Sequence, residues 1–367
     1  MKKYHSVILG VLFSLALLAG GMTVLLLPKE DFSEAERRPL ALLPEWNAET
    51  VLDGSCFEDT DLYVVDHFAG REEFRHIKAC WEFFVLRSNE NNGLVRSGKS
   101  IMKLEKHTNA ASLAYAANRL GAVYDAYLKN TDCGVFFAVV PDKSAFLKDK
   151  GYPTMDLSEM ETALSACLPG AKQLSLSCVL SLNDYYLTDT HWRQERLLPV
   201  AGTLLSGMGR PCSKLQEGNF SVRSYEPFYG VYAGQSALRP APETIFYLED
   251  GPLANCTVTD LLTVQKLPLY DPDGCDERDP YTLFLGGSKG LLRIENPDVS
   301  DGKELVVFRD SFGSSIAPLL AAEYSTVTLV DIRYVNPQFL RRYLRFDNRD
   351  VLFLYSATLL NNSQALQ

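Results

Sequence analysis

Apolar and polar positions alternate along the C-terminal part of the chain in a pattern that predicts an α/β sheet. Three apolar segments, ELVVF from Glu304, TVTLVDI from Thr326 and DVLFLYS from Asp350, are separated by helix-like segments over 314–324 and 337–346. Apolar strands that are separated by helices of about ten to fifteen residues are typical of a parallel sheet covered by helices. The continuously apolar segment CGVFFAVV, which begins at Cys133, predicts another strand that is buried on both faces.

Other segments of the chain predict helices and an insertion. Apolar residues recur at three- and four-residue steps over 58–88, which predicts a mostly helical stretch. The segment 109–129 predicts a further helix and the segment 155–168 an amphipathic one, and QLSLSCVL over 173–180 predicts a short strand or loop. Residues 211–280 are rich in Pro, Gly, Tyr and Asp and predict an inserted subdomain with short strands.

The N-terminal segment predicts a membrane anchor. Lys2 and Lys3 precede about 21 uncharged, mostly apolar residues from Val7 to Leu27, enough to cross a hydrocarbon core of roughly 30 Å as a helix. The two lysines favour a cytoplasmic N-terminus, which leaves the bulk of the chain outside the cell membrane. A cleaved signal peptide is the alternative, since LLAGG over 17–21 offers small residues, but the apolar run continues beyond it.

These patterns divide the chain into three parts. Residues 1–28 form a cytoplasmic flank and a single-pass transmembrane anchor, and residues 29–95 form an extended arm followed by a helical segment. Residues 96–367 form the main α/β domain, with its insertion at about 211–280. A chain of 367 residues with 46% hydrophobic residues has room for such a domain.

Charge and cysteine spacing bear on the possible ligands. The net charge is −10, and the 36 Lys and Arg residues are scattered among 46 acidic ones, so we expect no nucleic-acid partner. The eight cysteines contain no C-x-x-C pair, which argues against a zinc site, and we expect neither a metal nor a cofactor. An extracytoplasmic location permits disulfides, and buried free thiols are the alternative.

Ser311 lies at the junction between a predicted buried strand and a predicted helix. In open parallel sheets, ligands gather where strands end and the following helix presents free N–H groups. A serine at this place is displayed at the rim, and the helix N-terminus can stabilise an oxyanion that forms beside it. A simple helix cap is the alternative, because Asp and Ser are favoured at that position.

A nucleophilic serine needs a base, and His191 is the best candidate among five histidines. Asp189 and His191 are two residues apart, so both side chains project to one side of an extended or turn segment, and the aspartate can orient the imidazole. His67 also has an aspartate neighbour, Asp66, but adjacent side chains point in different directions and this histidine lies in a helical segment. His5 lies in the cytoplasmic flank, His76 lies within a charged helical stretch, and His107 is a loop residue without an acidic neighbour at short range.

The segments DTHW at 189–192 and VVFRDSFGSSIAPLLAAEY from Val306, together with EAERRPLALLPEW and DHFAGREEF upstream, resemble the DHHW family. That family belongs with SGNH-hydrolase-like proteins related to the alginate O-acetylation enzymes. The resemblance covers most of the chain from about Phe32. It implies a flavodoxin-like parallel sheet with helices on both faces, and it places the family's aspartate, histidine and serine on Asp189, His191 and Ser311.

The chain departs from the family pattern in two residues and from ordinary SGNH hydrolases in motif order. Thr190 replaces the second residue of the DHHW block, and it is not a triad member. Arg309 replaces the glycine of the usual Gly-Asp-Ser block, and we expect it to crowd the turn. The Asp-His block precedes the serine block in this chain, so the motif order is circularly permuted, but a triad depends on geometry rather than on chain order.

Four further residues are candidates for substrate binding or for an oxyanion site. Arg333 follows the strand after the serine helix. We expect it to contact an acyl oxygen or an anionic glycan, and the alternative is a surface arginine or one paired with an aspartate. Asn361 follows the last strand, where the SGNH asparagine would lie. Tyr186 and Trp192 flank the Asp-His pair, either to stack on sugar rings or to pack the loop against the core.

The expected function is transfer or hydrolysis of an acetyl ester through a Ser-His-Asp triad. The resemblance implies O-acetylation of a surface or secreted polysaccharide, with a membrane-bound O-acyltransferase as the acetyl donor. A non-catalytic glycan-binding or scaffold protein of a polysaccharide-modification system is the alternative.

Overall fold

The computed structural model describes residues 2–367, which form two compact units. The first unit comprises the chain up to Leu94 together with Val231–Pro240, and the second comprises Val95–Gly230 and Ala241–Gln367. All eight cysteines lie in this described part and carry free thiols, so no disulfide is present in it. The three-part division predicted from the sequence stays a prediction.

The second unit is built on a sheet that has eight strands within the described residues, in the order β11-β10-β12-β14-β13-β15-β6-β7. Strands β14, β13, β15, β6 and β7 are parallel, and β12, β10 and β11 continue the sheet in antiparallel pairs. The strands are β6 (Gly134–Val140), β7 (Lys172–Gln173), β10 (Thr257–Asp260), β11 (Gln265–Leu267), β12 (Leu291–Glu295), β13 (Glu304–Arg309), β14 (Thr326–Val330) and β15 (Asp350–Ser356). A mixed α/β fold with a large, mostly parallel sheet is therefore confirmed.

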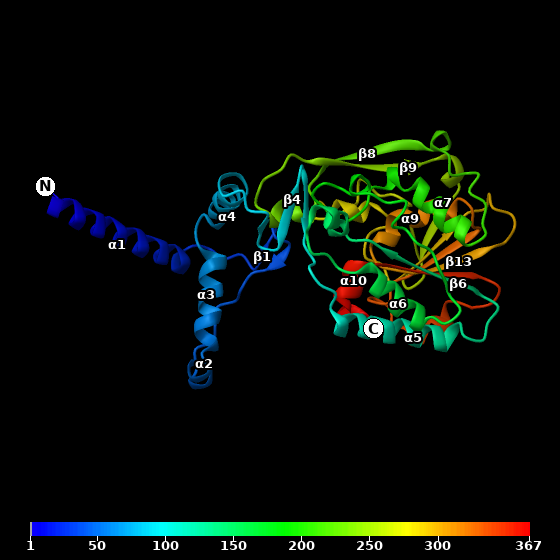
Figure 1. Ribbon diagram of the computed structural model, residues 1–367, viewed down its shortest axis with the longest axis horizontal. Helices are drawn as coiled ribbons and strands as arrows, with labels where there is room; N and C mark the ends of the chain where they lie inside the picture. Colours follow the sequence, from blue (N-terminus) through cyan, green and yellow to red (C-terminus); the bar gives the residue numbers. More distant parts are fainter. Residues whose placement is uncertain (1) are drawn as a thin grey trace. The chain divides into compact units, whose positions relative to one another are not determined.

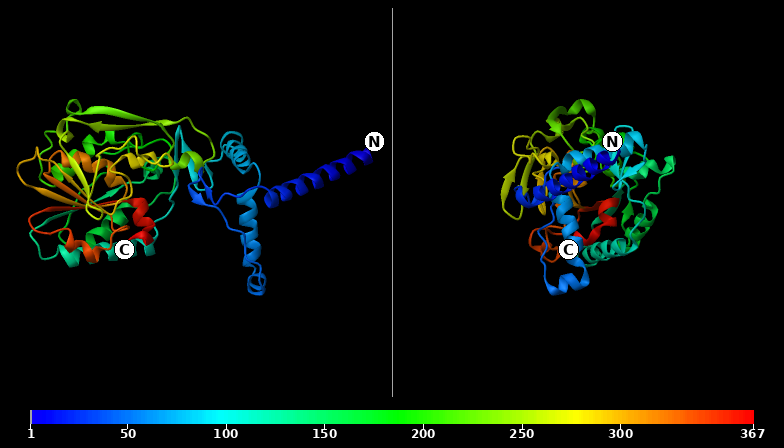
Figure 2. Two further views of the ribbon diagram at one scale, coloured as in Figure 1. Left: turned by 180° about the vertical axis from the view of Figure 1, so that it is seen from behind. Right: turned by 90° about the vertical axis from the view of Figure 1, so that its left-hand side faces the viewer.

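Helices cover both faces of this sheet (Figure 1). One layer contains α7 (Leu198–Gly207) and α9 (Phe312–Ala321), and the other contains α5 (Ala110–Tyr127), α6 (Leu157–Cys167) and α10 (Ala357–Asn361), as the reverse view in Figure 2 also shows. Alternate residues of β13 join the two cores: Val307 packs with the α7 and α9 side, and Val306 packs with the α5 and α6 side. Burial on both faces explains why these strands are continuously apolar.

The remaining elements of the second unit are short. Strands β8 (Ser221–Phe228) and β9 (Glu243–Glu249) form a separate antiparallel ribbon. The region predicted as an insertion supplies this ribbon and also β10 and β11 of the main sheet. Short helical turns occur at η2 (Lys143–Lys150), η3 (Leu182–Asp184), η4 (Gln194–Arg196), η5 (Glu217–Asn219), η6 (Gly251–Leu253), η7 (Pro280–Leu283), η8 (Pro337–Arg342) and η9 (Ser363–Ala365). Strand β4 (Leu94–Ser97) begins where the two units divide, and β5 (Ser100–Lys103) follows it.

One local prediction is wrong. The helix expected over 337–346 is limited to the single 3-10 turn η8, in which only Leu340 is buried. Only Leu340 and Leu344 of the expected ten residues are buried, which gives a longer helix too little packing to stabilise it. The segment 173–180, predicted as a short strand or loop, contributes Gln173 to β7 and is otherwise irregular.

The first unit begins with the apolar helix α1 (Lys2–Leu26). Its residues Val7–Leu26 have a mean hydropathy of 2.3 and are almost entirely exposed, so the helix is long and apolar enough to span a membrane, although a signal sequence has the same properties. The other elements of this unit are β1 (Phe32–Ser33), β2 (Arg38–Pro39), α2 (Ala48–Asp53), α3 (Ser55–His67), α4 (Arg71–Cys80), the π-helical turn η1 (Trp81–Val85), β3 (Glu90–Asn91) and α8 (Val231–Gln235). The arm expected to be extended therefore contains a β1–β2 pair and a helix.

The helical stretch predicted over 58–88 is divided into separate helices at Gly70. This residue has a φ of +73°, a conformation that favours glycine, and it ends the continuity between α3 and α4. The unit is tied together beside this break by Asp66, which accepts hydrogen bonds from the Arg38 guanidinium at 2.6 and 2.9 Å and from the Ala41 N–H at 2.9 Å. The bonds from Arg38 lower the pKa of the Asp66 carboxyl to about 2.

We expect Asp66→Asn to destabilise the first unit at neutral pH by roughly 1.5–3 kcal/mol, the usual contribution of hydrogen bonds to a charged group. Because the folded pKa is depressed, the carboxylate contributes its full stability above about pH 4 and loses it as the pH falls towards 2. Urea unfolding can be monitored by amide exchange in α3 and β2. The free energies of unfolding of the wild type and the variant should become equal as the pH falls from about 4 towards 2. Asp61→Asn, at an exposed position of the same helix, is the matched control and should behave as the wild type at every pH.

Candidate active site

Ser311 lies at the edge of the sheet where the parallel strands end. Strand β13 ends at Arg309, Asp310 follows, and Ser311 is the N-cap residue of α9. Residues 305–310 are buried, whereas Ser311 is half-buried and is the first residue after the strand that solvent reaches. The chain therefore leaves the core at the position where a hydroxyl can meet a ligand.

The structure brings Ser311, His191 and Asp189 together. The His191 Nε2 atom lies 2.8 Å from the Ser311 Oγ atom, and the His191 Nδ1 atom lies 2.6 Å from the Asp189 Oδ1 atom. A carboxylate accepts the proton of Nδ1, so the neutral ring presents a bare Nε2 to the serine hydroxyl. The Asp189 side chain is 3% exposed and that of His191 is 13% exposed, so the carboxylate is shielded while the imidazole edge stays accessible.

The segment that carries Asp189 and His191 is a tight loop with its own internal bonds. The Tyr186 N–H donates to the His191 carbonyl at 3.1 Å, and the His191 N–H donates to Asp189 Oδ1 at 3.0 Å. The Glu243 carboxylate accepts from the backbone N–H groups of Leu187 at 2.6 Å and Thr188 at 2.8 Å. These bonds fix the direction in which the imidazole points.

Lys143 holds the same loop from inside. Its ammonium is buried and donates to the carbonyls of Ile101 at 2.8 Å, Tyr186 at 2.8 Å, Leu187 at 3.1 Å and Asp189 at 2.9 Å. Burial lowers the pKa of Lys143 to about 8, so the charged form predominates at neutral pH. One cation thereby satisfies backbone carbonyls of the Asp-His loop that have left regular secondary structure.

Tyr281 in η7 supports the imidazole from one face. Its ring is stacked on that of His191 with a centroid distance of 3.9 Å and an interplanar angle of 9°, and Phe312 lies against the imidazole at 5.1 Å. The Tyr281 hydroxyl donates to Ser315 Oγ at 2.7 Å. Burial raises the pKa of Tyr281, so the phenol stays neutral and acts as a packed platform.

Asp310 connects the serine turn to the neighbouring strand. Its Oδ1 atom accepts from the Phe312 N–H at 3.0 Å, and its Oδ2 atom accepts from the Ser356 N–H at 2.8 Å, at the end of β15. The carboxylate thus caps α9 and joins the ends of β13 and β15. The Ser311 N–H has no partner among the hydrogen bonds of the described residues.

Arg309 does not crowd the turn as expected, because Gly313 makes room for it. A Cβ atom at Gly313 would lie 2.6 Å from the Arg309 Cβ atom. The Arg309 guanidinium donates to the carbonyls of Asp310 at 3.2 Å and Lys289 at 3.3 Å and to Ser314 Oγ at 3.1 Å. Burial lowers the pKa of Arg309, and Asp331 at 3.7 Å opposes this effect.

The four further candidates have other contacts. Arg333 is bound to Asp331 by two bonds of 2.9 and 2.6 Å, as the alternative interpretation predicts, and its side chain is 18% exposed. Asn361 is buried and accepts from the Asn109 N–H at 2.6 Å, so its contacts fix helix α5. None of the hydrogen bonds of the described residues joins it to Ser311 or His191.

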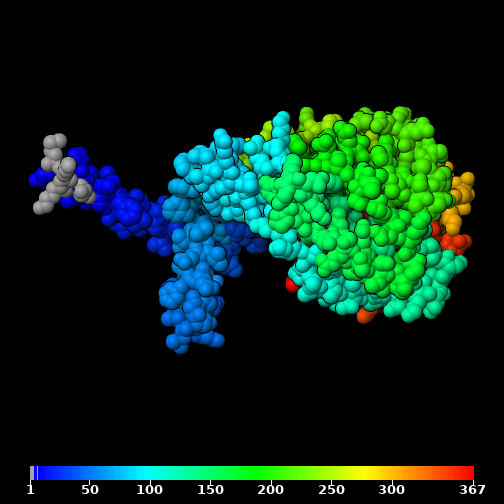
Figure 3. Space-filling model, viewed as in Figure 1, coloured from blue at the N-terminus to red at the C-terminus, as the bar shows by residue number. Residues whose placement is uncertain are grey.

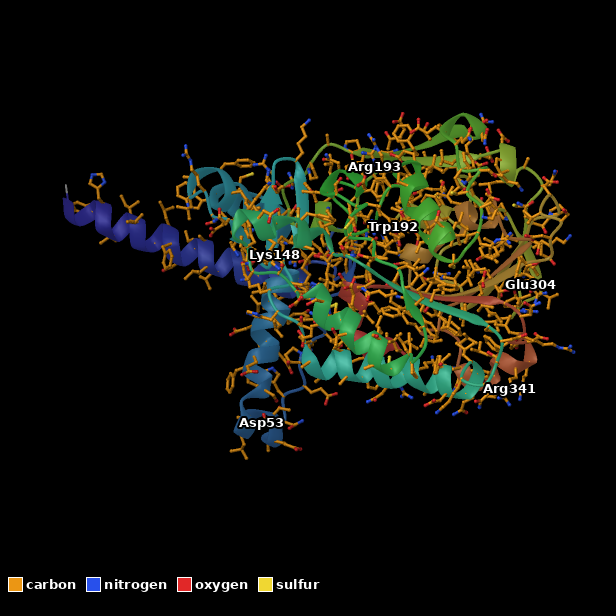
Figure 4. All side chains as sticks on the ribbon, turned by 45° about the vertical axis from the view of Figure 1, so that its right-hand side comes forward. Asp53, Lys148, Trp192, Arg193, Glu304 and Arg341 are labelled. Atoms are coloured by element: carbon orange, nitrogen blue, oxygen red, sulfur yellow. The ribbon has the colours of Figure 1, made fainter. Side chains whose placement is uncertain are left out.

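Trp192 and Tyr186 pack the loop against the core. Trp192, labelled in Figure 4, is fully buried, and its Nε1 atom donates to the Phe312 carbonyl at 3.1 Å and to Ser315 Oγ at 2.8 Å. Tyr186 is buried with its ring against Phe228. Neither ring presents a face on which a sugar can stack, so the packing alternative describes both residues.

Three contributors to the site were missed in the sequence: Lys143, Tyr281 and Glu243. Lys143 comes three residues after the last residue of β6, and a charged residue so close to a buried strand is the one local signal for it. Tyr281 and Glu243 lie 90 and 56 residues from their contacts, and no local pattern distinguishes them. Among the described residues, no group of three or more His, Cys, Asp or Glu side chains is placed to hold a metal ion.

No curated protein sequence matches the chain. A DHHW family protein from Eubacterium siraeum is similar in structure, with a TM-score of 0.60 and 19% identity, over 75% of this chain and 95% of that one. Bacillus cereus PatB1, solved with a sulfonyl adduct, has a TM-score of 0.58 and 18% identity, over 73% of this chain and 97% of that one. The O-acetyltransferase domain of Pseudomonas putida AlgJ matches with a TM-score of 0.44 and 12% identity, over 73% of this chain and 92% of that one.

At these identities, the Eubacterium siraeum protein and PatB1 show that the fold is shared. The family model described as DHHW protein matches residues 184–330, a range that contains Asp189, His191 and Ser311. The resemblance to the DHHW family that the sequence predicts is therefore confirmed over the part of the chain that carries the site.

Proposed function

We propose that this chain is an SGNH-type serine O-acetyltransferase or acetylesterase that acts on a surface or secreted polysaccharide. One observation carries the proposal: the continuous hydrogen-bonded line from Asp189 through His191 to Ser311, with distances of 2.6 and 2.8 Å. This arrangement of carboxylate, imidazole and hydroxyl is the one that activates serine for attack on an acyl group.

The proposed reaction has two halves. In the first, Nε2 of His191 accepts the hydroxyl proton while Oγ of Ser311 attacks the acetyl carbonyl, and the protonated imidazole then gives that proton to the departing alcohol. In the second, His191 deprotonates a sugar hydroxyl or water, whose oxygen attacks the acetyl-serine. The bond from the carbonyl carbon to Ser311 Oγ then breaks, and the imidazolium returns the proton to this oxygen. Asp189 keeps the ring in the correct tautomer and stabilises the imidazolium in both halves.

The start of α9 is suited to stabilise the oxyanion of each tetrahedral intermediate. The unpartnered Ser311 N–H is a ready donor, and the positive end of the helix dipole lies beside it. Asp310 already occupies the next N–H, that of Phe312, so the proposed hole centres on the serine itself.

The order of the parallel strands supports an SGNH-type fold with a permuted chain. Spatially they run β14-β13-β15-β6-β7. Counted from β13 through the C-terminus and then from β6, the order is 2-1-3-4-5, that of flavodoxin-like sheets. Ser311 follows the first strand in this count, at the point where the strand order reverses, where ligands bind in such folds.

The N-terminal helix and the family resemblance together support a location and partners. We propose that α1 anchors the chain in the cell membrane, with the catalytic unit outside the cytoplasm. A polysaccharide is then the acetyl acceptor, and a membrane-bound O-acyltransferase in the same bilayer is the acetyl donor. The net charge of −10 argues against a nucleic-acid partner.

Ser311→Ala should lower the rate of acetyl release from a chromogenic acetate ester by on the order of 10³-fold or more, because it removes the nucleophile. A second substitution, His191→Ala, should lower the rate little further, since the two residues act as a unit. Ser175→Ala, at an exposed position, is the control. If Ser311→Ala releases acetate as fast as the wild type, the chain is a glycan-binding or scaffold protein.

Asp189→Asn should lower kcat by about 10³- to 10⁴-fold without unfolding the protein, because an amide no longer holds Nε2 of His191 as the acceptor. Thr190→His, which restores the usual DHHW sequence, is the neighbouring control and should retain the wild-type rate. Steady-state kinetics with circular dichroism spectra measure both effects. A wild-type kcat in Asp189→Asn would exclude the proposed orienting role.

Lys143→Met should lower both kcat and stability, the latter by at least about 2 kcal/mol, because four backbone carbonyls lose their bond to the ammonium. Lys148→Met, on the exposed side of the same turn, should change neither. Chemical denaturation and kcat on the chromogenic ester are the measurements. Unchanged stability in Lys143→Met would contradict the proposal that the buried ammonium holds the loop.

A further inference from the structure

Helix α4 and the π-helical turn η1 expose an apolar face. Phe74, Ile77 and Trp81 follow one another at three- and four-residue steps, and their exposed fractions are 60%, 62% and 55%. Side chains at such steps lie on one side of a helix. This face is continuous and unusually apolar for a surface in water.

The polar face of α4 is the one that packs against protein. Arg75 donates to the carbonyls of Gly234 at 3.2 Å and Gln235 at 3.1 Å, and it pairs with Glu36 at 3.2 Å. The His76 ring bonds to the Ala237 carbonyl at 2.7 Å. An amphipathic helix in water turns its apolar stripe inward, and α4 does the reverse. The outward face therefore suits a medium that is itself apolar.

The exposed apolar surface extends to α3 through a groove. Val64, Val65 and Phe68 line it from α3 and its C-terminal end, and Phe74 lines it from α4, with the Phe68 and Phe74 rings 5.6 Å apart. The groove has a volume of about 560 Å³. Two arginines line its rim, and both are paired: Arg71 with Glu36 and Glu72, and Arg75 with the same two carboxylates. Lys78 at the rim donates to Asn92 Oδ1 at 3.0 Å, so the surface offers mainly apolar area.

This surface is continuous with the helix that we propose as the membrane anchor. The Phe68 ring packs directly on the backbone of Gly20, where an added Cβ atom would lie 2.9 Å from it. Gly20 is six residues from Leu26, the end of α1, and at 1.5 Å per residue Phe68 lies roughly 9 Å inside the apolar segment. Interfacial helices bury their apolar face about 5–10 Å into the headgroup and acyl boundary, which is the same depth.

The direction of α3 agrees with this placement. In Figures 1 and 2, α3 runs across the direction of α1 rather than along it. In Figure 3 the residues of α3, in mid-blue, lie at the surface of the face shown. A helix that lies across a membrane-spanning helix lies along the membrane plane.

We propose that the apolar face formed by Val64, Val65, Phe68, Phe74, Ile77 and Trp81 lies in the interfacial region of the bilayer that α1 spans. The inference rests on the membrane anchor proposed above. The first unit then holds the membrane at two places, with a spanning helix and an interfacial surface beside it. Because the surface is apolar and its neighbouring arginines are paired, it should bind zwitterionic lipid and resist salt.

Tryptophan fluorescence of the full chain in phosphatidylcholine vesicles tests this placement. The chain has three tryptophans, and in a Trp46→Phe background the signal comes from Trp81 and from the fully buried Trp192. Lipids brominated near the headgroup end of the acyl chain should quench part of the emission, and aqueous iodide should quench little. A further Trp81→Phe substitution should abolish the quenching by lipid. High salt should leave it unchanged.

Alkaline carbonate extraction of the same vesicles tests the anchor separately. Carbonate resistance together with quenching by brominated lipid supports the proposal. Carbonate resistance with Trp81 open to iodide overturns the interfacial placement and leaves the anchor intact. Shielding of Trp81 from both quenchers also overturns it, since a protein partner or a second copy then covers the face. Extraction of the chain by carbonate overturns the anchor and the placement together.

A paired substitution, Phe74→Ser with Ile77→Ser, isolates the surface from the anchor. It should remove the quenching of Trp81 by brominated lipid while carbonate resistance and acetyl release from the chromogenic ester stay as in the Trp46→Phe background. Retained quenching in this variant would overturn the role of the α4 face.

Discussion

A strand that is buried on both faces can carry polar chemistry only where it ends, and β13 obeys this constraint. From Leu305 to Asp310 the chain is enclosed between two helical layers, and Ser311 is the first position that reaches solvent. Asp310 satisfies the backbone at this exit by accepting from Phe312 and Ser356. The position of the hydroxyl therefore follows from the same burial that stabilises the sheet, and every other part of the site is arranged around it.

The loop that carries Asp189 and His191 has irregular backbone, yet it lies in the interior of the protein. Irregular buried segments leave N–H and C=O groups without the partners that helices and strands provide. In this loop Glu243 accepts from N–H groups, Lys143 donates to carbonyls, and Tyr281 fixes the plane of the ring. Buried charges are costly to desolvate, and hydrogen bonds to several backbone groups at once offset this cost. These contacts keep the imidazole within bonding distance of Ser311.

The sequence predicts the reacting groups better than their supports. Ser311 follows from a strand-to-helix junction, and Asp189 and His191 follow from two-residue spacing and a family motif, because both signals are local. Tyr281 and Glu243 reach the loop only through folding, so no window of sequence contains the relation. Trp192 and Tyr186 show a different limit. An aromatic residue beside a site can face the ligand or the core, and the sequence pattern does not distinguish the two.

The helical segment over 58–88 illustrates the same limit for the fold. Its periodicity identifies Phe74, Ile77 and Trp81 as one face of a helix. Periodicity does not show whether such a face is buried or exposed, and in this protein it is exposed. The division at Gly70 depends on a single backbone conformation, which a periodic pattern cannot reveal.

Arg309 and Gly313 form one steric unit, and this has a consequence for how such a sequence can arise. A residue with a Cβ atom fits at position 309 only because Gly313, four residues later, lacks one. A lineage that gained the arginine while a larger residue stood at position 313 would have lost the serine turn, so the glycine had to be in place first. The reverse order is constrained as well: position 313 becomes free to vary only after position 309 has returned to glycine.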